Sequence, residues 1–514
     1  MASQVSKARL KIHDLGNLAT LLDDVRSKGQ KIVQCHGVFD LLHIGHIRHF
    51  QEARTYGDIL VVTLTPDEHV NKGPSRPVFG QDLRAEAIAS LDCVDYVAIN
   101  QWPLAVEAIN LIRPDHYVKG SDYQESDDDR TGGIVQEEEA VKNVGGELVF
   151  TNDITFSSST LINRNMPVFS QEVIDYLEDI SSRYSSNDVI KYLDGARDLK
   201  VLVVGETIID EYLYCEPLGK TGKEPVLAAR FVSEDKFAGG TVAVANHVSG
   251  FSDHVTLLTF LGEGNSQEEF VRRNVGDSID DIYLYQRDDT PTIVKRRFIS
   301  NYPFQTLFEV YEMNDDDFTP EETQSFCTKL EEMLPDFDLV IVADYGHGMF
   351  GPEAVEVLCE KSRFLAVNTQ VNAGNRGFNT VSKYPRADLL CVSENEIRLE
   401  ARSQSRNLHE IMSEISAKLS CERIVITRGP NGCITYRETE GFFQTPAFAA
   451  RVVDRIGAGD AVFFVAALCA AQQAPMELVG LIGNAAGAEA VATIGHQSSI
   501  QALGLSRHIE ALLR

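Results

Sequence analysis

Short apolar, β-branched runs alternate with helical patterns along most of the chain. In the first third, runs typical of strands lie at 31–35, Ile59–Leu64, Tyr96–Ile99, 116–118 and 147–150. The segments between them place apolar side chains three and four residues apart, as 47–56 does, which is typical of helices. This alternation predicts a parallel sheet covered by helices.

The hydrophobic pattern changes between about 166 and 197. Four apolar positions fall at helical spacing, and these are Val173, Tyr176, Leu177 and Ile180. A polar break at 181–188 follows them. We expect a helical linker here. A new strand begins at Lys200–Gly205, alternation resumes, and the apolar run 462–471 predicts a buried helix. The prediction is therefore an α/β protein with segments 1–165, 166–197 and 198–514.

Composition narrows the class of protein. A chain of 514 residues is too long for one core, and 43% hydrophobic with 24% charged residues is ordinary for a globular protein. A net charge of −29 argues against nucleic-acid binding, so anionic substrates would need local cations and Mg²⁺. The nine cysteines show no metal or disulfide spacing. The sequence also shows no membrane span and no signal peptide. We therefore expect a cytoplasmic protein.

The segment His43-Ile44-Gly45-His46 lies between the strand 31–35 and the helix 47–56. A helix N-terminus offers free N–H groups to an anion, and Gly45 lets a nucleotide approach the backbone. Two imidazoles one turn apart can donate to phosphate oxygens that gain charge when an α-phosphorus is attacked. Two ordinary histidines are the alternative, and the strand–turn–helix setting favours the functional interpretation.

Cations and hydroxyl groups follow at later turns. Lys72 and Arg76 flank a rigid proline turn, as a triphosphate clamp requires. Lys119 ends a strand before Gly120, where parallel sheets bind ligands. A hydroxyl cluster at 156–162 opens a helix, and taken alone it favours simple helix capping.

Together these motifs resemble the cytidylyltransferase-like nucleotidyltransferase family, with the ADP-heptose synthase branch most similar and glycerol-phosphate cytidylyltransferases next. The resemblance implies that a sugar phosphate attacks the α-phosphate of ATP or CTP and that pyrophosphate leaves. It implies catalytic roles for His43, His46 and Lys119, nucleotide or phosphate contacts for Gly37, Phe39, Gly45, Lys72, Arg76, Arg84, Gly120, Ser158, Ser159 and Thr160, and Mg²⁺ contact for Asp40.

A second phosphate motif precedes the apolar run 462–471. Gly457-Ala458-Gly459 would expose free N–H groups to a transferred phosphoryl group, and Asp460 could accept a proton from a substrate hydroxyl. A glycine turn capped by an aspartate is the simpler alternative. Further turns of the same kind contain Asp210, Gly239, Gly240, Thr427, Gly429, Gly432 and Asn484.

This second set resembles the ribokinase-like PfkB sugar kinases, and most closely the heptose-phosphate kinase half of bifunctional heptose enzymes. The segments 290–298 and 343–348 also fit that branch. The resemblance implies ATP-dependent phosphorylation of a sugar or sugar phosphate, with Asp460 as the base. It further implies a β-lid from 212–237 and 293–311, which often forms the dimer interface. The remaining assignments are sugar contact by Asp210, Gly239 and Gly240, nucleotide contact by Thr427, Gly429, Gly432, Gly457, Ala458, Gly459 and Asn484, and Mg²⁺ contact by Glu396.

The second half departs from its family pattern at four places, which are Ala243, Ile456, Ser393 and the run Asn368-Thr369-Gln370. These departures leave two hypotheses open. Either the chain both phosphorylates a sugar and couples it to a nucleotide, or only the transferase works and the kinase-like half binds a ligand or dimerises. In the bacterial heptose enzymes the kinase half comes first, so the order here is reversed.

Overall fold

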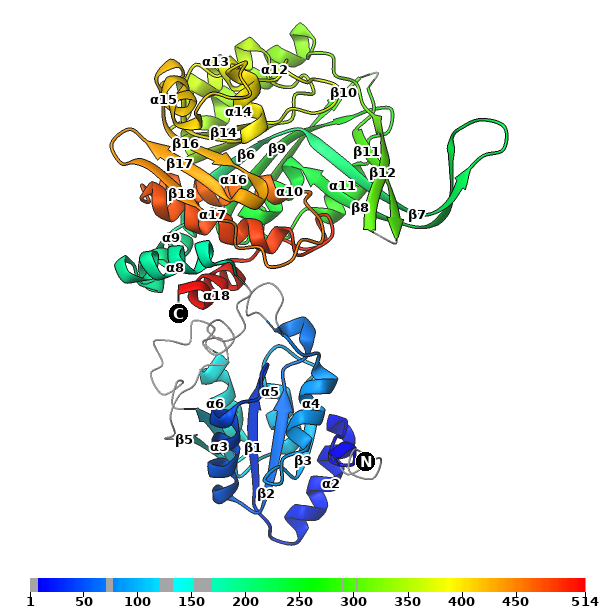
Figure 1. Ribbon diagram of the computed structural model, residues 1–514, viewed down its shortest axis with the longest axis vertical. Coiled ribbons are helices and arrows are strands. Elements are labelled where there is room, and N and C mark those ends of the chain that lie inside the picture. Colours follow the sequence, from blue (N-terminus) through cyan, green and yellow to red (C-terminus); the bar gives the residue numbers. More distant parts are fainter. Residues whose placement is uncertain are drawn as a thin grey trace. The chain divides into compact units, whose positions relative to one another are not determined.

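The computed structural model describes residues 8–70, 77–120, 133–151, 169–288, 290–301 and 304–513. The chain forms two compact units, the first running to Ser170 and the second spanning 171–513 (Figure 1). Each unit has its own sheet and its own core. The two are described separately below.

The first unit contains a five-stranded sheet in the order β3-β2-β1-β4-β5, with all neighbours parallel. Its strands are β1 (Ile32–Gly37), β2 (Ile59–Leu64), β3 (Tyr96–Ile99), β4 (His116–Gly120) and β5 (Glu147–Thr151). The strand order reverses between β1 and β4. In open α/β sheets such a switch point marks where ligands bind, beyond the carboxyl ends of the strands.

Alternation of side chains along the strands sends residues to two helical layers. On one face, Ile32 and Val61 pack with helices α2 (Leu15–Ser27) and α5 (Val106–Ile112). On the other, Val33 and Val62 pack with α3 (Ile44–Ala53) and α4 (Gln81–Ala89). Helix α6 (Gly133–Asn143) packs beside α5. Both faces are covered, which explains why the strands are almost wholly apolar.

The second unit contains a nine-stranded sheet in the order β10-β9-β6-β13-β14-β15-β16-β17-β18. The strands from β10 to β16 are parallel, and β17 and β18 add an antiparallel edge. They are β6 (Lys200–Gly205), β9 (His254–Gly262), β10 (Asp281–Arg287), β13 (Leu339–Asp344), β14 (Leu365–Thr369), β15 (Ala387–Ser393), β16 (Cys421–Thr427), β17 (Cys433–Arg437) and β18 (Gly441–Thr445).

Helices cover both faces of this sheet (Figure 1). One group contains α12 (Pro320–Met333), α13 (Pro352–Lys361), α14 (Glu394–Glu400) and α15 (Leu408–Lys418). The other contains α10 (Thr241–Val248), α16 (Ala458–Ala471) and α17 (Met476–Ala490). Helix α16 is buried along 460–470, as its apolar sequence predicts. The short helix α11 (Glu268–Asn274) follows β9.

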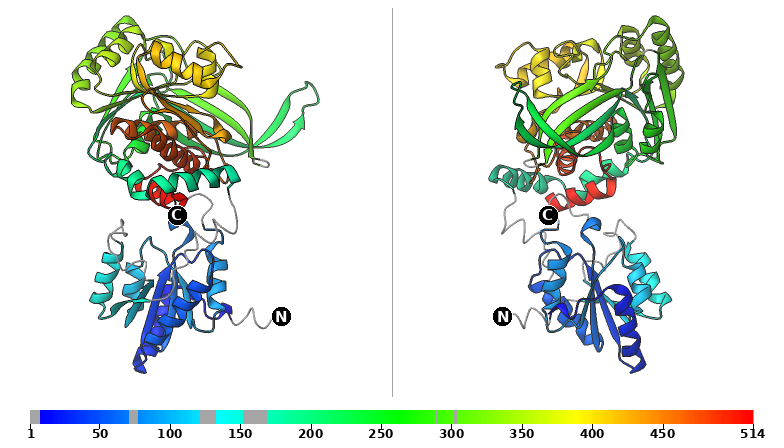
Figure 2. Two further views of the ribbon diagram at one scale, coloured as in Figure 1. Left: turned by 60° about the vertical axis from the view of Figure 1, so that its left-hand side comes forward. Right: turned by 90° about the vertical axis from the view of Figure 1, so that its right-hand side faces the viewer.

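A smaller four-stranded sheet in the order β12-β11-β7-β8 forms a lid. Strands β7 (Thr207–Lys220) and β8 (Leu227–Gly240) pair as a long antiparallel hairpin, and β11 (Ile293–Asn301) joins β7 in parallel. Strand β12 (Phe304–Glu312) closes the lid edge. The tip of the hairpin projects from the rest of the unit (Figure 2).

The segment 166–197 contains α8 (Gln171–Arg183) and α9 (Ser186–Asp194), which belong to the second unit. Arg183 forms a two-point ion pair with Glu477, with N–O distances of 2.6 Å, and the hydroxyls of Tyr176 and Thr445 are 3.3 Å apart. The C-terminal helix α18 (Ala502–Leu513) completes this unit. No helix in the described ranges is long and apolar enough to cross a membrane. The architecture confirms the predicted α/β class with a small β-lid.

Candidate functional site

The first candidate site begins at the N-terminus of α3, directly after β1. His43 is the N-cap of this helix, and its Nδ1 accepts a hydrogen bond of 3.1 Å from the Gly45 amide. A neutral imidazole that accepts at Nδ1 carries its proton on Nε2, so His43 can donate from that atom. Partial burial lowers the pKa of His43 below 6.5, which favours this neutral form. The rings of His43 and His46 stack with centroids 3.9 Å apart.

The loop before α3 holds this histidine pair in place. Phe39 has a φ of +46°, which is unusual for a side chain other than glycine. Its ring meets His46 edge-on, with centroids 5.2 Å apart, and Phe50 at 4.9 Å. A Cβ on Gly37 would lie 3.1 Å from the Phe39 ring, so the close approach favours glycine there. Gly37 and Phe39 therefore shape the turn that positions the imidazoles.

Arg84 is buried beneath the loops that surround this site. Its guanidinium donates to the carbonyls of Phe79, Val38 and Thr65 and pairs with Asp67 at 2.6 Å. Each of these contacts ties a separate piece of loop to α4. The structure thus gives Arg84 a role in holding the loops together, and its contact with a phosphate stays a prediction.

Asp40 is also buried, and its Oδ1 accepts a hydrogen bond of 2.5 Å from the Val78 amide. Lys119 reaches the same sheet edge from the end of β4 and pairs with Glu137 at 2.8 Å. Glu137 also accepts a 3.0 Å hydrogen bond from the Tyr117 hydroxyl. Burial raises the pKa of Glu137 and the Lys119 ammonium lowers it, and the net shift is downward. Glu137 therefore stays ionised at neutral pH.

Two neighbouring histidines are held neutral. Burial, assisted by the Lys119 charge, lowers the pKa of His36 and of His49 to about 4. Their Nδ1 atoms lie 2.9 Å and 3.0 Å from the hydroxyls of Thr63 and Thr151. Neither imidazole therefore adds positive charge beside the Lys119 ammonium at neutral pH.

A groove of about 690 Å³ opens at the carboxyl ends of β2 and β3. It is lined by polar and apolar side chains, among them His13, Asp14, Asp67, Gln81 and Asn100. The Oδ1 of Asn100 is buried without a hydrogen-bond partner among the described residues. This oxygen can accept a hydrogen bond from a ligand hydroxyl. Lys72, Arg76, Ser158, Ser159 and Thr160 lie outside the described residues.

The second candidate site lies at the N-terminus of α16. Gly457 precedes the helix with a φ of +78°, and a Cβ there would lie 2.6 Å from His496. The first amides of a helix have no acceptor within it, so those of Ala458 and Gly459 can receive an anion. Asp460 is buried in the same turn and accepts a 3.2 Å hydrogen bond from Tyr345. Burial raises the pKa of Asp460 to about 6, against the opposing effect of His496.

Asp210 faces this turn from the lid strand β7. It pairs with Arg297 of β11, and its Oδ2 lies 3.8 Å from His496. A Cβ on Gly239 would lie 2.1 Å from the Asp210 carboxylate, so glycine is required there. Gly240, with a φ of +57°, begins α10. The structure thus brings the predicted sugar residues Asp210, Gly239 and Gly240 together near the predicted base Asp460.

Four further residues gather here that the sequence prediction did not include: Lys295, Arg297, Tyr345 and His496. The first three lie within segments already noted for their resemblance to kinases, and alternation along β11 could have indicated Lys295 and Arg297. His496 follows a glycine near the end of the chain and carries no sequence signal. Burial lowers the pKa of Lys295, while Asp210 opposes this shift.

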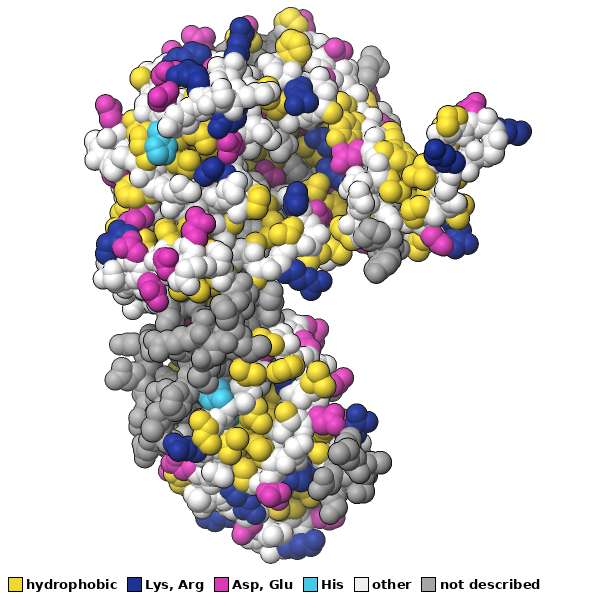
Figure 3. Space-filling model, in the orientation of Figure 1, with side chains coloured by type: hydrophobic (Ala, Val, Ile, Leu, Met, Phe, Trp, Pro, Cys, Tyr) yellow, Lys and Arg dark blue, Asp and Glu magenta, His cyan; other side chains and the backbone are white. Residues whose placement is uncertain are grey.

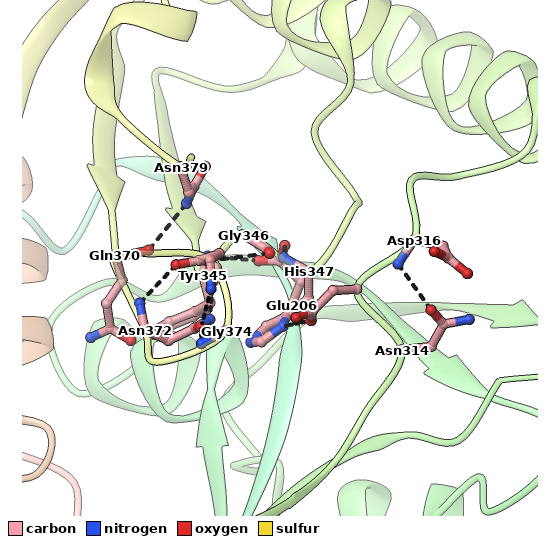
Figure 4. Close-up of polar contacts among 12 residues, drawn as sticks. Glu206, Asn314, Asp316, Tyr345, Gly346, His347, Gln370, Asn372, Gly374 and Asn379 are labelled. Carbon is pink, nitrogen blue, oxygen red and sulfur yellow. Dashed lines mark hydrogen bonds and ion pairs between the residues drawn. The ribbon is translucent and has the colours of Figure 1, made fainter. Parts of the chain in front are cut away.

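A polar network surrounds the carboxyl ends of β13 and β14 (Figure 4). The fully buried Glu206 accepts backbone hydrogen bonds of 2.9 Å from Tyr345 and 3.1 Å from His347. The His347 Nδ1 lies 2.6 Å from Asp315. Asn372 and Asn379 donate to backbone carbonyls of this region. The network fixes the loop that follows β13.

The structure shows the surroundings of residues at the four departures from the kinase pattern. Ala243 is buried in α10, and Ile456 packs beside the aromatic cluster at the lid base. The side-chain amide of Asn368 donates a hydrogen bond of 2.7 Å to the Cys391 carbonyl. Ser393 caps α14 in a capping box with Glu396, whose other oxygen accepts 3.0 Å from Val371. Each Glu396 oxygen keeps a second lone pair.

The remaining predicted nucleotide residues lie around β16 and α17. Thr427 ends β16, and a short turn contains Gly429 and Gly432, both with positive φ. A Cβ on Gly432 would lie 1.9 Å from the Thr445 carbonyl, which explains the glycine. Asn484 is buried and donates to Cys433 Sγ at 2.8 Å. In the described part of the chain, no three His, Cys, Asp or Glu side chains form a metal-binding group.

Comparison with known proteins supports two families in one chain. Residues 35–190 match the cytidylyltransferase-like family. Over 175 residues the chain is 34% identical to the bifunctional protein HldE of Geobacter metallireducens. The aligned region covers 34% of this chain and 34% of that protein. HldE of Geotalea uraniireducens is 38% identical over 154 residues, 30% of each chain. The matched region spans about a third of these relatives' length.

Among solved structures, Arabidopsis thaliana ribokinase complexed with ribose and ATP aligns with 61% of this chain and 99% of its own, at 16% identity and a TM-score of 0.47. Escherichia coli phosphofructokinase-2 in complex with fructose-6-phosphate aligns with 62% and 100%, at 14% identity and a TM-score of 0.47. The family described as pfkB family carbohydrate kinase matches residues 198–503. Because this match covers more than half of the sequence, the chain belongs to the pfkB family of carbohydrate kinases.

Proposed function

We propose that this chain is a bifunctional enzyme that makes a nucleotide-activated sugar. The second unit would phosphorylate a sugar or sugar phosphate with ATP. The first would then couple a sugar phosphate to the nucleotide of ATP or CTP and release pyrophosphate. The observation that carries this proposal is that each unit gathers its own reactive groups at the carboxyl edge of a parallel sheet, His43 with His46 in one and Asp460 with Asp210 in the other.

In the first unit, an oxygen of the sugar phosphate forms a bond to the α-phosphorus while the bond to pyrophosphate breaks. His43 can donate its Nε2 proton to the phosphate oxygens, since Nδ1 is held by the Gly45 amide. His46, stacked on His43, donates beside it, and the ammonium of Lys119 adds positive charge. The groove that contains Asn100 is the proposed place for the sugar, whose hydroxyls can donate to its buried carbonyl oxygen.

In the second unit, Asp460 accepts the proton of a sugar hydroxyl as that oxygen attacks the γ-phosphorus and ADP leaves. The amides of Gly457, Ala458 and Gly459 receive the transferred group at the start of α16. Asp210 and the Gly239-Gly240 turn hold the sugar. Mg²⁺ carried by the nucleotide would neutralise phosphate charge, with Asp40 and Glu396 as the proposed protein contacts.

The identity of the sugar is proposed as heptose-like, since the curated relatives over the first unit are bifunctional HldE proteins. Their kinase half would precede the transferase half, and here that order is reversed. The proposed site of action is the cytoplasm. We also propose a homodimer through the lid, where hydrophobic side chains lie exposed on the projecting hairpin (Figure 3): Leu218, Leu227, Phe231 and Val232.

Two point variants of the intact chain test the assignment. His46→Ala should abolish pyrophosphate release from nucleoside triphosphate and sugar phosphate, while sugar phosphorylation continues. Asp460→Asn should abolish ATP-dependent sugar phosphorylation, while pyrophosphate release continues. A scan of heptoses, hexoses and polyols with the four nucleoside triphosphates identifies the substrates. Parental rates in either variant would contradict the assignment for that unit.

A second candidate function keeps only the transferase, with a polyol-phosphate acceptor, and makes the kinase-fold unit a ligand-binding or dimerisation module. The capping box that occupies Glu396, together with the departure from the family pattern at Asn368-Thr369-Gln370, favours this alternative. Sugar binding by the intact chain without ADP formation, measured calorimetrically in the presence of ATP and Mg²⁺, would support it.

A further inference from the structure

Tyr345 lies directly after β13 and reaches the proposed base of the second unit. Its side chain is 2% exposed, and its hydroxyl donates a 3.2 Å hydrogen bond to Oδ1 of Asp460. The two residues are more than a hundred positions apart in sequence and meet only because the fold brings β13 beside α16. No motif in the sequence connects them.

The backbone of Tyr345 is held on both sides (Figure 4). Its amide donates 2.9 Å to Glu206, a fully buried carboxylate at the end of β6. Its carbonyl accepts from the side-chain amides of Asn372 and Asn375, at 3.2 Å and 3.0 Å. Glu206 also receives the amide of His347, two residues further on. The phenol therefore points at Asp460 from a rigid support.

The chemistry of the phenol suits a permanent donor. Burial, and then the Asp460 carboxylate, raise the pKa of Tyr345 well above 10, so the hydroxyl keeps its proton throughout the working pH range. A hydrogen bond donated to a carboxylate stabilises its ionised form and fixes the direction of its oxygens. Oδ1 is then held, which leaves Oδ2 of Asp460 to take the substrate proton.

We infer that Tyr345 is the positioning residue for the proposed base Asp460, and that Glu206, Asn372 and Asn375 hold it for that purpose. The inference rests on the proposed kinase function of the second unit. Three other charged or titratable groups face Asp460, and these are His496, Asp210 and Lys295. Of these groups and Tyr345, all within the described residues, only Tyr345 donates a hydrogen bond to the Asp460 carboxylate.

The test compares Tyr345→Phe with Tyr384→Phe in the full chain. Tyr384 is an equally buried tyrosine whose hydroxyl donates 2.7 Å to a different carboxylate, Asp344. Sugar phosphorylation is followed as kcat/KM against pH. The acid limb of this profile is the range in which activity falls as Asp460 becomes protonated. Because Tyr345→Phe removes a hydrogen bond that favours ionised Asp460, we expect the acid limb to lie about one pH unit higher. We also expect about a tenfold lower kcat at pH 7, with KM for ATP unchanged.

Tyr384→Phe should leave the acid limb where the parent has it. Two results would overturn the inference. In one, the acid limb of Tyr345→Phe coincides with that of the parent. In the other, the acid limb of Tyr384→Phe shifts as far as that of Tyr345→Phe. Complete absence of sugar phosphorylation in the parent at every pH would instead contradict the proposed function.

A double-mutant cycle in unfolding free energy tests the hydrogen bond between Tyr345 and Asp460 independently of activity. It combines Tyr345→Phe with Asp460→Asn at pH 8 and at pH 5, on either side of the Asp460 pKa of about 6. We expect the two substitutions to be non-additive at pH 8, where Asp460 is ionised, and closer to additive at pH 5. Equal coupling at both pH values would overturn the inference.

Discussion

The backbone amide of Gly45 donates to Nδ1 of His43 at 3.1 Å, and this contact determines which ring nitrogen of His43 carries the proton. The helix thereby uses one of its own unsatisfied amides to orient the residue that caps it. The opposite nitrogen becomes a fixed donor at the switch point of the sheet.

His43→Ala should lower the rate of pyrophosphate release roughly 100- to 1,000-fold, because it removes a preorganised donor to the transition state. The measurement is pyrophosphate release under saturating nucleotide. Phosphorylation by the second unit serves as the internal control and should not change. Because burial lowers the pKa of His43, any acid loss caused by its protonation should lie below pH 6.5. A variant with the parental transferase rate would refute the role.

Glu137→Ala should destabilise the first unit by about 3–5 kcal/mol, since it removes the carboxylate that pairs with the buried Lys119 ammonium at 2.8 Å. Chemical denaturation at pH 7 measures this. The neighbouring Glu138→Ala is the control and should cost less than about 0.5 kcal/mol, because its pair with Lys142 is exposed. The folded pKa of Glu137 is depressed, so its stabilisation is present above the ordinary value of 4.5 and is lost as pH falls through the folded pKa.

Asp460→Asn should stabilise the second unit at pH 8 while it abolishes phosphorylation. The pKa of Asp460 rises from 3.8 to about 6, so burial of its charge costs up to about 3 kcal/mol above that pH. Stability from this group is complete below pH 3.8 and declines as pH rises through 6. The gain in Tm for Asp460→Asn over the parent should therefore vanish below pH 4. A gain independent of pH would contradict the assignment.

Gly239→Ala should raise KM for the sugar about tenfold or more, because its Cβ would lie 2.1 Å from the Asp210 carboxylate and would displace it. The affinity for ATP should stay near the parental value. Gly504→Ala in α18 is the matched control, since no atom beyond its chain neighbours and the adjacent helix backbone lies within 4 Å of the added Cβ. That control should leave both constants unchanged and add a few tenths of a kcal/mol of stability.

Phe231→Asp should convert the proposed lid dimer to a monomer, because it places a charge among the exposed apolar side chains of the hairpin. Sedimentation velocity on the intact chain measures the change. Phe378→Asp is the control: Phe378 is 90% exposed but lies outside the lid, so its substitution should leave the dimer intact. A monomeric parent would contradict the proposed interface.

Much of the architecture follows from local pattern. The strands Ile59–Leu64 and Tyr96–Ile99 lie where their apolar runs predict. A parallel sheet covered by helices on both faces buries every side chain of a strand, so such strands form continuous apolar runs. The apolar run at 462–471 likewise forms a buried helix, although α16 begins four residues earlier. Gly459 and Asp460 lie in the first turn of that helix, and they interrupt the apolar pattern from which the rest was predicted.

The site was harder to predict because its members come from distant strands. Asp460 was indicated by its motif, whereas Tyr345 and His496 reach it from the ends of other segments. Arg84 shows the opposite difficulty. An arginine near phosphate motifs suggests a ligand contact, but three backbone carbonyls bind its guanidinium in the fold. A sequence pattern does not reveal which acceptors will lie nearby.

The left-handed backbone at Phe39 means that the first site becomes ordered when the chain folds. Its φ of +46° carries a local conformational cost of roughly 1–3 kcal/mol, which the packing of its ring against His46 and Phe50 offsets. The chain meets this cost once, when it folds. Under the proposed function, a nucleotide would then meet imidazoles that are already aligned, and little conformational entropy would remain to be lost in each turnover.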